Sequence, residues 1–101
     1  MRRSGHPLLR ADIREAALWY ERQAQGLGRR FTAEVIETLR RLPHEALLYA
    51  IRFGNVRRVN LPSFPYGVFY FISNDTVVVL GVLHGARESR EELERRRQSL
   101  D

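Results

Sequence analysis

The sequence YGVFYFISNDTVVVLGVLH, residues 66–84, is the most informative stretch of this 101-residue chain. Apolar and β-branched residues dominate it on both sides of Asn74-Asp75, a pair that tolerates positive φ and is typical of tight hairpin loops. We therefore predict two antiparallel strands, Tyr66–Ser73 and Thr76–His84. The nearly continuous Val and Leu content of the second strand indicates burial on both faces, and hence a central position in the sheet.

The region upstream of this hairpin predicts a third strand. The hydrophobic pattern changes to a period of two over Val56–Leu61, which is typical of a strand. The sequence Pro62-Ser63-Phe64-Pro65 then provides a turn. Together with the hairpin, this strand makes a predicted three-stranded meander. Residues 44–55 have no clear period and are compatible with a turn and a short extended piece around Leu48–Phe53.

The first half of the chain has the spacing of two amphipathic helices. Asp12 fits the N-cap or an early-turn position of the first helix, and Gly26-Leu27-Gly28 ends it. A second helix follows, which Pro43 is expected to stop. Because the turn between the helices has only about three residues, they must fold back on each other as an antiparallel hairpin. The apolar stripes are Ile13, Ala16, Ala17, Tyr20 and Ala24 on the first helix, and Phe31, Val35, Leu39 and Leu42 on the second.

The last segment, from Ser89 to Leu100, is predicted to be a short charged helix. Ser89 and Glu92 have the spacing of a capping box. Only two residues, Leu93 and Leu100, could anchor this helix to a core. We therefore expect it to lie at the surface.

These elements predict one α+β domain over residues 1–101. A helical hairpin can bury its apolar stripe on one face of an antiparallel sheet, with the short C-terminal helix added at the end. Residues 1–10 are polar and are predicted to be irregular. The expected order is therefore helix, helix, three strands and a short helix.

The composition favours a basic protein without a cofactor. The formal net charge is +5 and all 17 basic residues are arginines, whose guanidinium groups bind carboxylate and phosphate bidentately. Such a surface favours a nucleic acid, an acidic protein or an anionic membrane as partner. The chain has no cysteine, and His6, His44 and His84 lack metal-ligand spacing, so we expect neither a disulfide nor a metal site.

The sequence contains no pattern of membrane insertion. The longest apolar run, Val77–Leu83, is far shorter than the about 20 residues that span a bilayer. Met1-Arg2-Arg3 is not followed by the apolar core of a signal peptide. We therefore expect a cytoplasmic protein with no membrane partner.

Four segments of the chain occur in an order and spacing that are together fairly specific. They are Asp12-Ile13-x-x-Ala16-x-x-Trp19-Tyr20-Glu21, Gly26-Leu27-Gly28-x-x-Phe31, Val56-Arg57-Arg58-x-x-Leu61-x-x-Phe64-Pro65-Tyr66-x-Val68-x-Tyr70, and Val79-Leu80-x-Val82-Leu83-His84-x-x-Arg87. Together they resemble the ParE/RelE toxin superfamily, and most closely its ParE-like branch, over about residues 7–97. The resemblance implies a helical hairpin on a twisted antiparallel sheet that is usually opened by an N-terminal strand, although Met1–Gly5 lacks the alternating apolar residues of a strand.

The resemblance implies the toxin of a type II toxin–antitoxin module. Its partner would be a DNA-binding antitoxin whose acidic C-terminal segment wraps the toxin. The leading interpretation is a growth inhibitor that binds DNA gyrase and performs no chemistry of its own. The alternatives are a RelE-type endoribonuclease that cuts mRNA on the ribosome, and an inactivated toxin that acts only as a binding partner.

A nuclease would need proton carriers and cations around a phosphate. The candidates for these roles are His84, Tyr70 and Arg87, the first of which also fits a hydrogen-bonded residue at a strand end. The chain has no lysine and no clear acid–base pair. This deficit favours binding over catalysis.

Two apolar residues, Leu18 and Trp19, fall off the stripe of the first helix. They can pack under the C-terminal helix or serve as interface anchors, since Trp is enriched at binding hot spots. The first role is structural, and the second would place them against the antitoxin or the target.

Four arginines are further candidates for binding the target or the antitoxin. Alternation puts only one of Arg57 and Arg58 on the face of a strand that carries Val59. Both also fit solvated charges on an edge strand. Arg87 ends the third strand, and Arg95 begins an arginine run that is either a solvated helix end or an attraction for carboxylates or phosphates.

Overall fold

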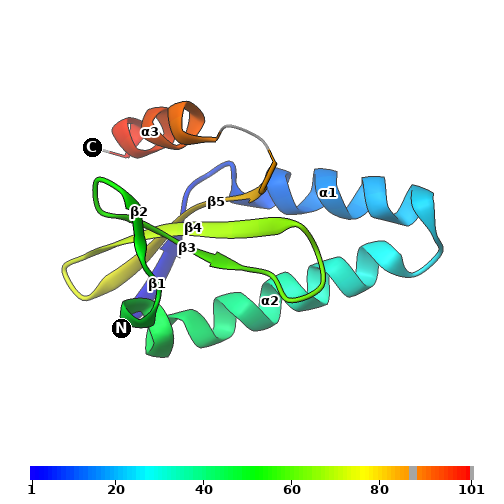
Figure 1. The fold of residues 1–101 in the computed structure, drawn as a ribbon, viewed down its shortest axis with the longest axis horizontal. Coiled ribbons are helices and arrows are strands. Elements are labelled where there is room, and N and C mark those ends of the chain that lie inside the picture. The colour runs from blue at the N-terminus through cyan, green and yellow to red at the C-terminus, as the bar shows by residue number, and fades with distance from the viewer. Residues whose placement is uncertain (87–88, 101) are drawn as a thin grey trace.

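A five-stranded mixed sheet forms the centre of the protein, with a helical hairpin on one face and a short helix on the other (Figure 1). The computed structural model describes residues 1–86 and 89–100. The strand order is β1-β5-β4-β3-β2. The elements are β1 (Arg2–Gly5), α1 (Leu9–Gln23), α2 (Leu27–Glu45), the 3₁₀ turn η1 (Ala46–Leu48), β2 (Ile51–Phe53), β3 (Val56–Asn60), β4 (Tyr66–Ser73), β5 (Thr76–His84) and α3 (Arg90–Ser99).

The central hairpin forms as its sequence predicts. β4 and β5 have the predicted bounds and pair antiparallel, from Tyr66 opposite His84 to Ser73 opposite Thr76. Asn74 and Asp75 have φ values of 50° and 60°, the left-handed pair that a tight two-residue loop requires. The α+β fold class is confirmed.

The prediction that residues 1–10 are irregular is wrong, because Arg2–Gly5 forms β1. This strand runs parallel to β5, so the sheet is mixed and not purely antiparallel. All four side chains are exposed, which is why no apolar alternation marks the strand. Backbone pairing holds it instead, and just beyond it the His6 N–H donates to the Val79 carbonyl at 2.8 Å. With β1 on one side and β4 on the other, β5 is an inner strand, as its two buried faces predict.

The helix ends differ from the prediction. Leu8, and not Asp12, occupies the N-cap of α1, so Asp12 is the acid of the first turn. Pro43 lies inside α2 and does not stop it, because Leu42 before it and Ala46 after it are both buried in the core. The extended piece predicted around Leu48–Phe53 is shorter, since its beginning belongs to the 3₁₀ turn.

The hairpin of α1 and α2 covers one face of the sheet with the predicted stripe. Phe31 and Val35 are fully buried, and the Tyr20 ring stacks on Phe31 with 5.4 Å between centroids. Burial of each such side chain contributes roughly 1.5–3 kcal/mol relative to exposure. On the sheet these residues meet Val59, Leu61, Val68, Tyr70, Val77, Val79 and Val82.

The opposite face of the sheet is covered by α3 through one leucine. Leu93 is fully buried in a second cluster with Val56, Phe69, Phe71 and Leu80. Leu100 is largely exposed and does not anchor the helix.

The capping box predicted at the start of α3 does not form. Ser89 occupies the N-cap position, but its side chain makes no cap hydrogen bond. Glu92 instead accepts from Arg95 and Arg96 at 2.6 and 2.7 Å. Ion pairs within α3 have therefore replaced the cap.

A buried ion pair between Asp12 and Arg96 joins α1 to α3. The Arg96 Nη1 and Nη2 donate to the two Asp12 oxygens at 2.6 and 2.9 Å, and each side chain is only 8% exposed. The two side chains of the pair also form hydrogen bonds with the backbone at a bulge in β5, where β1 no longer lies beside this strand. There the Leu80 carbonyl accepts from Arg96 at 3.1 Å, and the Val82 N–H donates to Asp12 at 3.0 Å. Gly81 is required, because a Cβ at this position would lie 2.6 Å from the Arg96 Nη1.

His6 adds a second connection between the N-terminal region and α3. Its Nδ1 accepts from the Leu8 N–H at 3.0 Å, so the neutral ring carries its proton on Nε2, which lies 2.9 Å from the Ser99 Oγ. The Ser99 hydroxyl in turn donates to the Arg96 carbonyl at 2.7 Å. Burial, followed by the charge of Arg96, lowers the pKa of His6 and keeps the ring neutral.

We predict that Asp12→Asn destabilises the fold by about 3–5 kcal/mol, because it leaves a buried arginine without its countercharge. Chemical denaturation followed by circular dichroism measures the loss. The matched control is Arg95→Gln on the exposed side of α3, which should cost far less. Equal losses for the two variants would contradict the assigned role of the buried pair.

Candidate functional site

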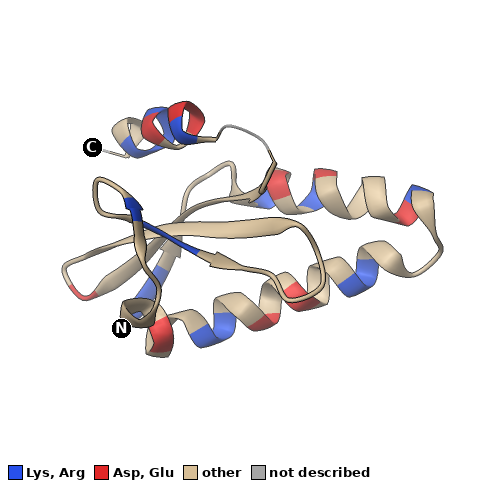
Figure 2. Cartoon of the chain, in the orientation of Figure 1, with Lys and Arg blue, Asp and Glu red and all other residues tan. Residues whose placement is uncertain are grey.

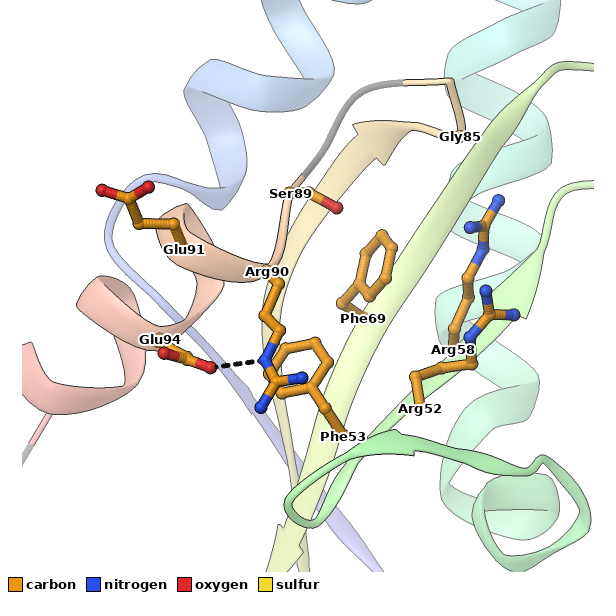
Figure 3. A pocket seen from close by; sticks show the side chains of 9 residues that line it. All are labelled: Arg52, Phe53, Arg58, Phe69, Gly85, Ser89, Arg90, Glu91 and Glu94. Atoms are coloured by element: carbon orange, nitrogen blue, oxygen red, sulfur yellow. Dashed lines mark hydrogen bonds and ion pairs between the residues drawn. The ribbon is translucent and has the colours of Figure 1, made fainter.

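An arginine-lined cleft lies between the sheet and α3 (Figure 3). Its cavity volume is about 540 Å³. Arg52 of β2 and Arg58 of β3 form the sheet side, and Arg90 begins the helix side. Figure 2 shows the distribution of charge among the elements: β1, β2 and β3 carry arginines and no acid, whereas α1, α2 and α3 carry both signs.

Two glycines leave the space that the Arg58 side chain occupies. A Cβ at Gly67 would lie 2.5 Å from the Arg58 Nε, and one at Gly85 would lie 2.6 Å from its Nη2. The guanidinium lies over the Phe69 ring, 5.3 Å from its centroid, and the Nε donates to the Asn60 Oδ1 at 2.6 Å. The glycines therefore leave space for the side chain, while the Phe69 ring and one hydrogen bond hold it in position.

The sheet side of the cleft has positive charge without a countercharge. Within residues 1–86 and 89–100, no carboxylate forms an ion pair with Arg52 or Arg58. Burial, and then the neighbouring charge of Arg52, lower the pKa of Arg58. The two guanidinium groups are thus close enough to repel each other, and an anion between them would relieve the repulsion.

The helix side of the cleft carries both signs of charge. The Arg90 Nε donates to the Glu94 Oε1 at 2.7 Å, and the guanidinium lies 4.9 Å from the centroid of the Phe53 ring. Glu91 belongs to the same helix, but its carboxylate points away from the cleft (Figure 3) and pairs with Arg95. The cleft therefore has a positive wall that faces a wall of mixed sign.

A second candidate surface is the groove between α1 and α2 on the outer face of the hairpin, which we name the hairpin groove. Its cavity volume is about 660 Å³, and Leu18 and Ile36 are 52% and 58% exposed there. Gly28 lets the helices approach, since a Cβ would clash with the Ala17 carbonyl oxygen. The floor also contains Ile13, Ala17 and Ala33, and the arginines of the rim are Arg10, Arg14 and Arg29.

Leu18 and Trp19 are not brought together. Leu18 lines the hairpin groove, whereas Trp19 lines a separate cavity of about 510 Å³ with Tyr66 and His84. The Trp19 ring lies edge-on to Tyr20 and is half exposed. Neither residue packs under α3, so that interpretation is wrong.

Of the residues proposed for a nuclease, Tyr70 and His84 do not share a site. Tyr70 is fully buried under the hairpin, where its hydroxyl donates to the Ala46 carbonyl at 2.6 Å and burial raises its pKa to about 12. His84 lines a small cavity beside Arg58, with its ring against Tyr66 and its Nδ1 accepting from the Ala86 N–H at 3.0 Å. Arg87 lies outside the described residues.

Of the other arginines singled out in the sequence, only Arg58 reaches the cleft. Arg57 points to the hairpin side of the sheet, where its Nη1 donates to the Tyr49 carbonyl at 2.6 Å. Arg95 is exposed on α3 and pairs with Glu91 and Glu92.

The residues that complete the cleft were missed by sequence reasoning. Arg52 and Phe53 belong to a segment without a clear period, and Arg90 comes from a helix that is distant in the chain. The only sequence signal was the position of Gly67 and Gly85 at a strand start and a strand end, which no local rule connects to an arginine.

The part of the chain that the structure describes meets neither the requirements of a metal cluster nor those of a membrane-spanning helix. No group of three His, Asp or Glu residues there could hold a metal ion. In the same residues, no helix is both long enough and apolar enough to cross a membrane.

Comparisons with known proteins agree on one family. A family model described as the ParE toxin of the type II toxin–antitoxin system parDE matches residues 6–89. A solved structure of a chromosomal ParDE toxin–antitoxin system from P. aeruginosa is similar with a TM-score of 0.72 at 16% identity, over 83% of this chain and 95% of that chain. At this identity the likeness establishes the fold alone. No curated protein sequence matches the chain.

We predict that Tyr70→Phe lowers stability by about 1–3 kcal/mol, because the Ala46 carbonyl is left buried without a donor. It should leave any activity of the folded protein unchanged. Tyr49→Phe is the control, because its partner Glu45 is half-exposed and can turn to water. Denaturation curves and growth inhibition measure the two effects. Loss of growth inhibition at unchanged stability would contradict a purely structural role of Tyr70.

Proposed function

Because the chain belongs to the ParE family of toxins from type II toxin–antitoxin systems, we propose that it inhibits growth by binding DNA gyrase in the cytoplasm and that a cognate antitoxin neutralises it. Membership covers 84 consecutive positions, residues 6–89, and so includes the helical hairpin and the four strands β2 to β5. The gyrase target and the antitoxin are the parts of this proposal that need experiments.

Inhibition by binding is supported by the separation of groups that catalysis would need together. Transfer of a 2′-OH proton and protonation of a leaving oxygen need two accessible proton carriers at one phosphate. Tyr70 is enclosed by the hairpin core, whereas His84 lies beside Arg58 in a cavity that Tyr66 also lines. The separation of Tyr70 from His84 and Arg58 supports inhibition by binding.

The hairpin groove supports a helical antitoxin segment as its occupant. An apolar floor with exposed Leu18 and Ile36 suits the apolar face of an amphipathic helix. The arginines on its rim, Arg10, Arg14 and Arg29, complement acidic residues along the edges of such a helix. The chain therefore offers shape and charge for the same kind of partner.

The gyrase part of the proposal is tested with purified components. We expect micromolar toxin to inhibit supercoiling of relaxed plasmid by gyrase, and expression of the chain alone to arrest growth. The same preparation mixed with ribosomes and mRNA should leave the mRNA intact. Unimpaired supercoiling at micromolar toxin removes gyrase as the target, and cleaved mRNA would establish the enzymatic alternative.

The proposed binding of the antitoxin is tested with a substitution in the hairpin groove. Leu18→Asp places a charge on its apolar floor and should weaken binding of the antitoxin, the product of the adjacent reading frame, by at least about tenfold. Leu47→Asp is the matched control, because Leu47 is 67% exposed and lies outside the groove. Isothermal titration calorimetry measures both affinities. An equal effect of the two substitutions would show that the antitoxin docks elsewhere.

A further inference from the structure

His6 is a buried titratable side chain that belongs to neither the arginine-lined cleft nor the hairpin groove. It follows β1 directly, and only 7% of its surface is exposed. Both ring nitrogens are engaged, since Nδ1 accepts from the Leu8 N–H at 3.0 Å and Nε2 lies 2.9 Å from the Ser99 Oγ. The Ser99 hydroxyl already donates to the Arg96 carbonyl, so the Nε2–H is the donor toward Ser99. The ring therefore connects the start of α1 to the end of α3.

These hydrogen bonds are compatible only with the neutral ring. A proton on Nδ1 would turn this nitrogen from an acceptor into a second donor, and its bond with the Leu8 N–H would be lost. The new positive charge would also lie near Arg96, whose guanidinium shares the carboxylate of Asp12. Protonation therefore removes one hydrogen bond and adds repulsion beside the ion pair that joins α1 to α3.

The charged groups around the ring come from three elements. Arg96 and Glu92 of α3 and Asp12 of α1 act on it, while Arg3 of β1 and Arg10 of α1 line a small cavity with it. The two carboxylates favour a charged ring, but Arg96 pairs with both of them, at 2.6 and 2.7 Å. Burial, and then the charge of Arg96, prevail and lower the pKa of the ring.

The attachment of α3 to the sheet has little apolar contact. Leu93 is the apolar side chain that it buries, and the Arg97 guanidinium lies 3.5 Å from the centroid of the Phe71 ring. The other attachments are the buried ion pair and the contact of Ser99 with His6. Loss of one polar attachment therefore weighs heavily on the docking of this helix.

We propose that His6 is a pH-sensitive switch for α3, in which protonation of the ring undocks this helix from the sheet and uncovers the apolar surface beneath Leu93. The inference goes beyond the proposed function, since it concerns a response of the fold to acid and holds for any target of the toxin.

The direction of the response follows from proton binding. The pKa of His6 is lowered in the docked state, so the released state binds the proton more tightly. The docking free energy that the neutral ring contributes is fully present above the ordinary pKa of histidine. It is lost as the pH falls from that value toward the lowered pKa of the docked state.

The experiment follows amide hydrogen exchange of the full chain by NMR between about pH 8 and about pH 5. Protection factors, which correct for the intrinsic pH dependence of exchange, are compared between α3 and the strands β4 and β5. We expect protection of α3 to fall at least about tenfold in acid, as it does when the released state binds a proton at least about ten times more tightly. The strands should change by less than about twofold. Unchanged protection of α3, or an equal loss in the strands, would overturn the proposal.

His6→Asn separates the charge of the ring from its hydrogen bond. The Asn carboxamide oxygen can accept from the Leu8 N–H as Nδ1 does, but this side chain cannot become charged. Protection of α3 should then stay constant to within about twofold over the same pH range. Asp12 and Glu92 remain in the variant, so an acid response that persists in it belongs to the carboxylates and contradicts the proposal.

His44→Asn is the matched control, because His44 is exposed in the last turn of α2. It should retain the full acid response, and loss of the response in this variant would contradict the assignment to His6. If His6→Asn does not fold, Ser99→Ala removes the partner of Nε2 and keeps the ring. It should lower protection of α3 at about pH 8 by about two- to tenfold, the effect of one hydrogen bond. Protection equal to that of the wild type would show that the ring does not hold the helix.

Discussion

The ion pair between Asp12 and Arg96 satisfies backbone groups of β5 where the strand β1 no longer lies beside it. β1 ends opposite Val79, and the bulge after it leaves the Leu80 carbonyl and the Val82 N–H without sheet partners. In the interior, such groups cost free energy unless they are bonded. The two charged side chains supply both bonds and satisfy each other. A single interaction therefore completes the sheet and fixes the positions of α1 and α3 on it.

The arginine cleft depends on this interaction. Its helix wall is α3, which contributes one leucine, Leu93, and the Arg96 guanidinium to the interior. With so small an apolar contact, the ion pair has a large share in holding the wall at its distance from β3. The binding surface at the start of α3 is thus coupled to a contact near its end, about two turns away.

The parts of the fold that the sequence predicted are those that local rules control. The β4–β5 hairpin follows from Asn74-Asp75 and its apolar flanks, and the helical hairpin follows from its two stripes and a short glycine turn. The strand β1 could have been inferred indirectly, because a strand buried on both faces cannot lie at the edge of a three-stranded meander. The ion pair had no such signal, since its partners are 84 residues apart and one of them stood in an apparent N-cap position. The cleft was unpredictable for the same reason, because it is assembled from three distant segments.

The alternation of the sheet also decides which side chains are enclosed and which remain open. Alternation along β3 and β4 sends Arg58 and Phe69 to the α3 face, and Val59 and Tyr70 to the hairpin face. The hairpin face is the larger core, so a tyrosine there is enclosed and its hydroxyl is used to satisfy a helix end. The arginines that face α3 remain open, because that helix is short and covers only part of the sheet. One period of two therefore separates Tyr70 from Arg58, and of these two side chains only the arginine lines a cavity.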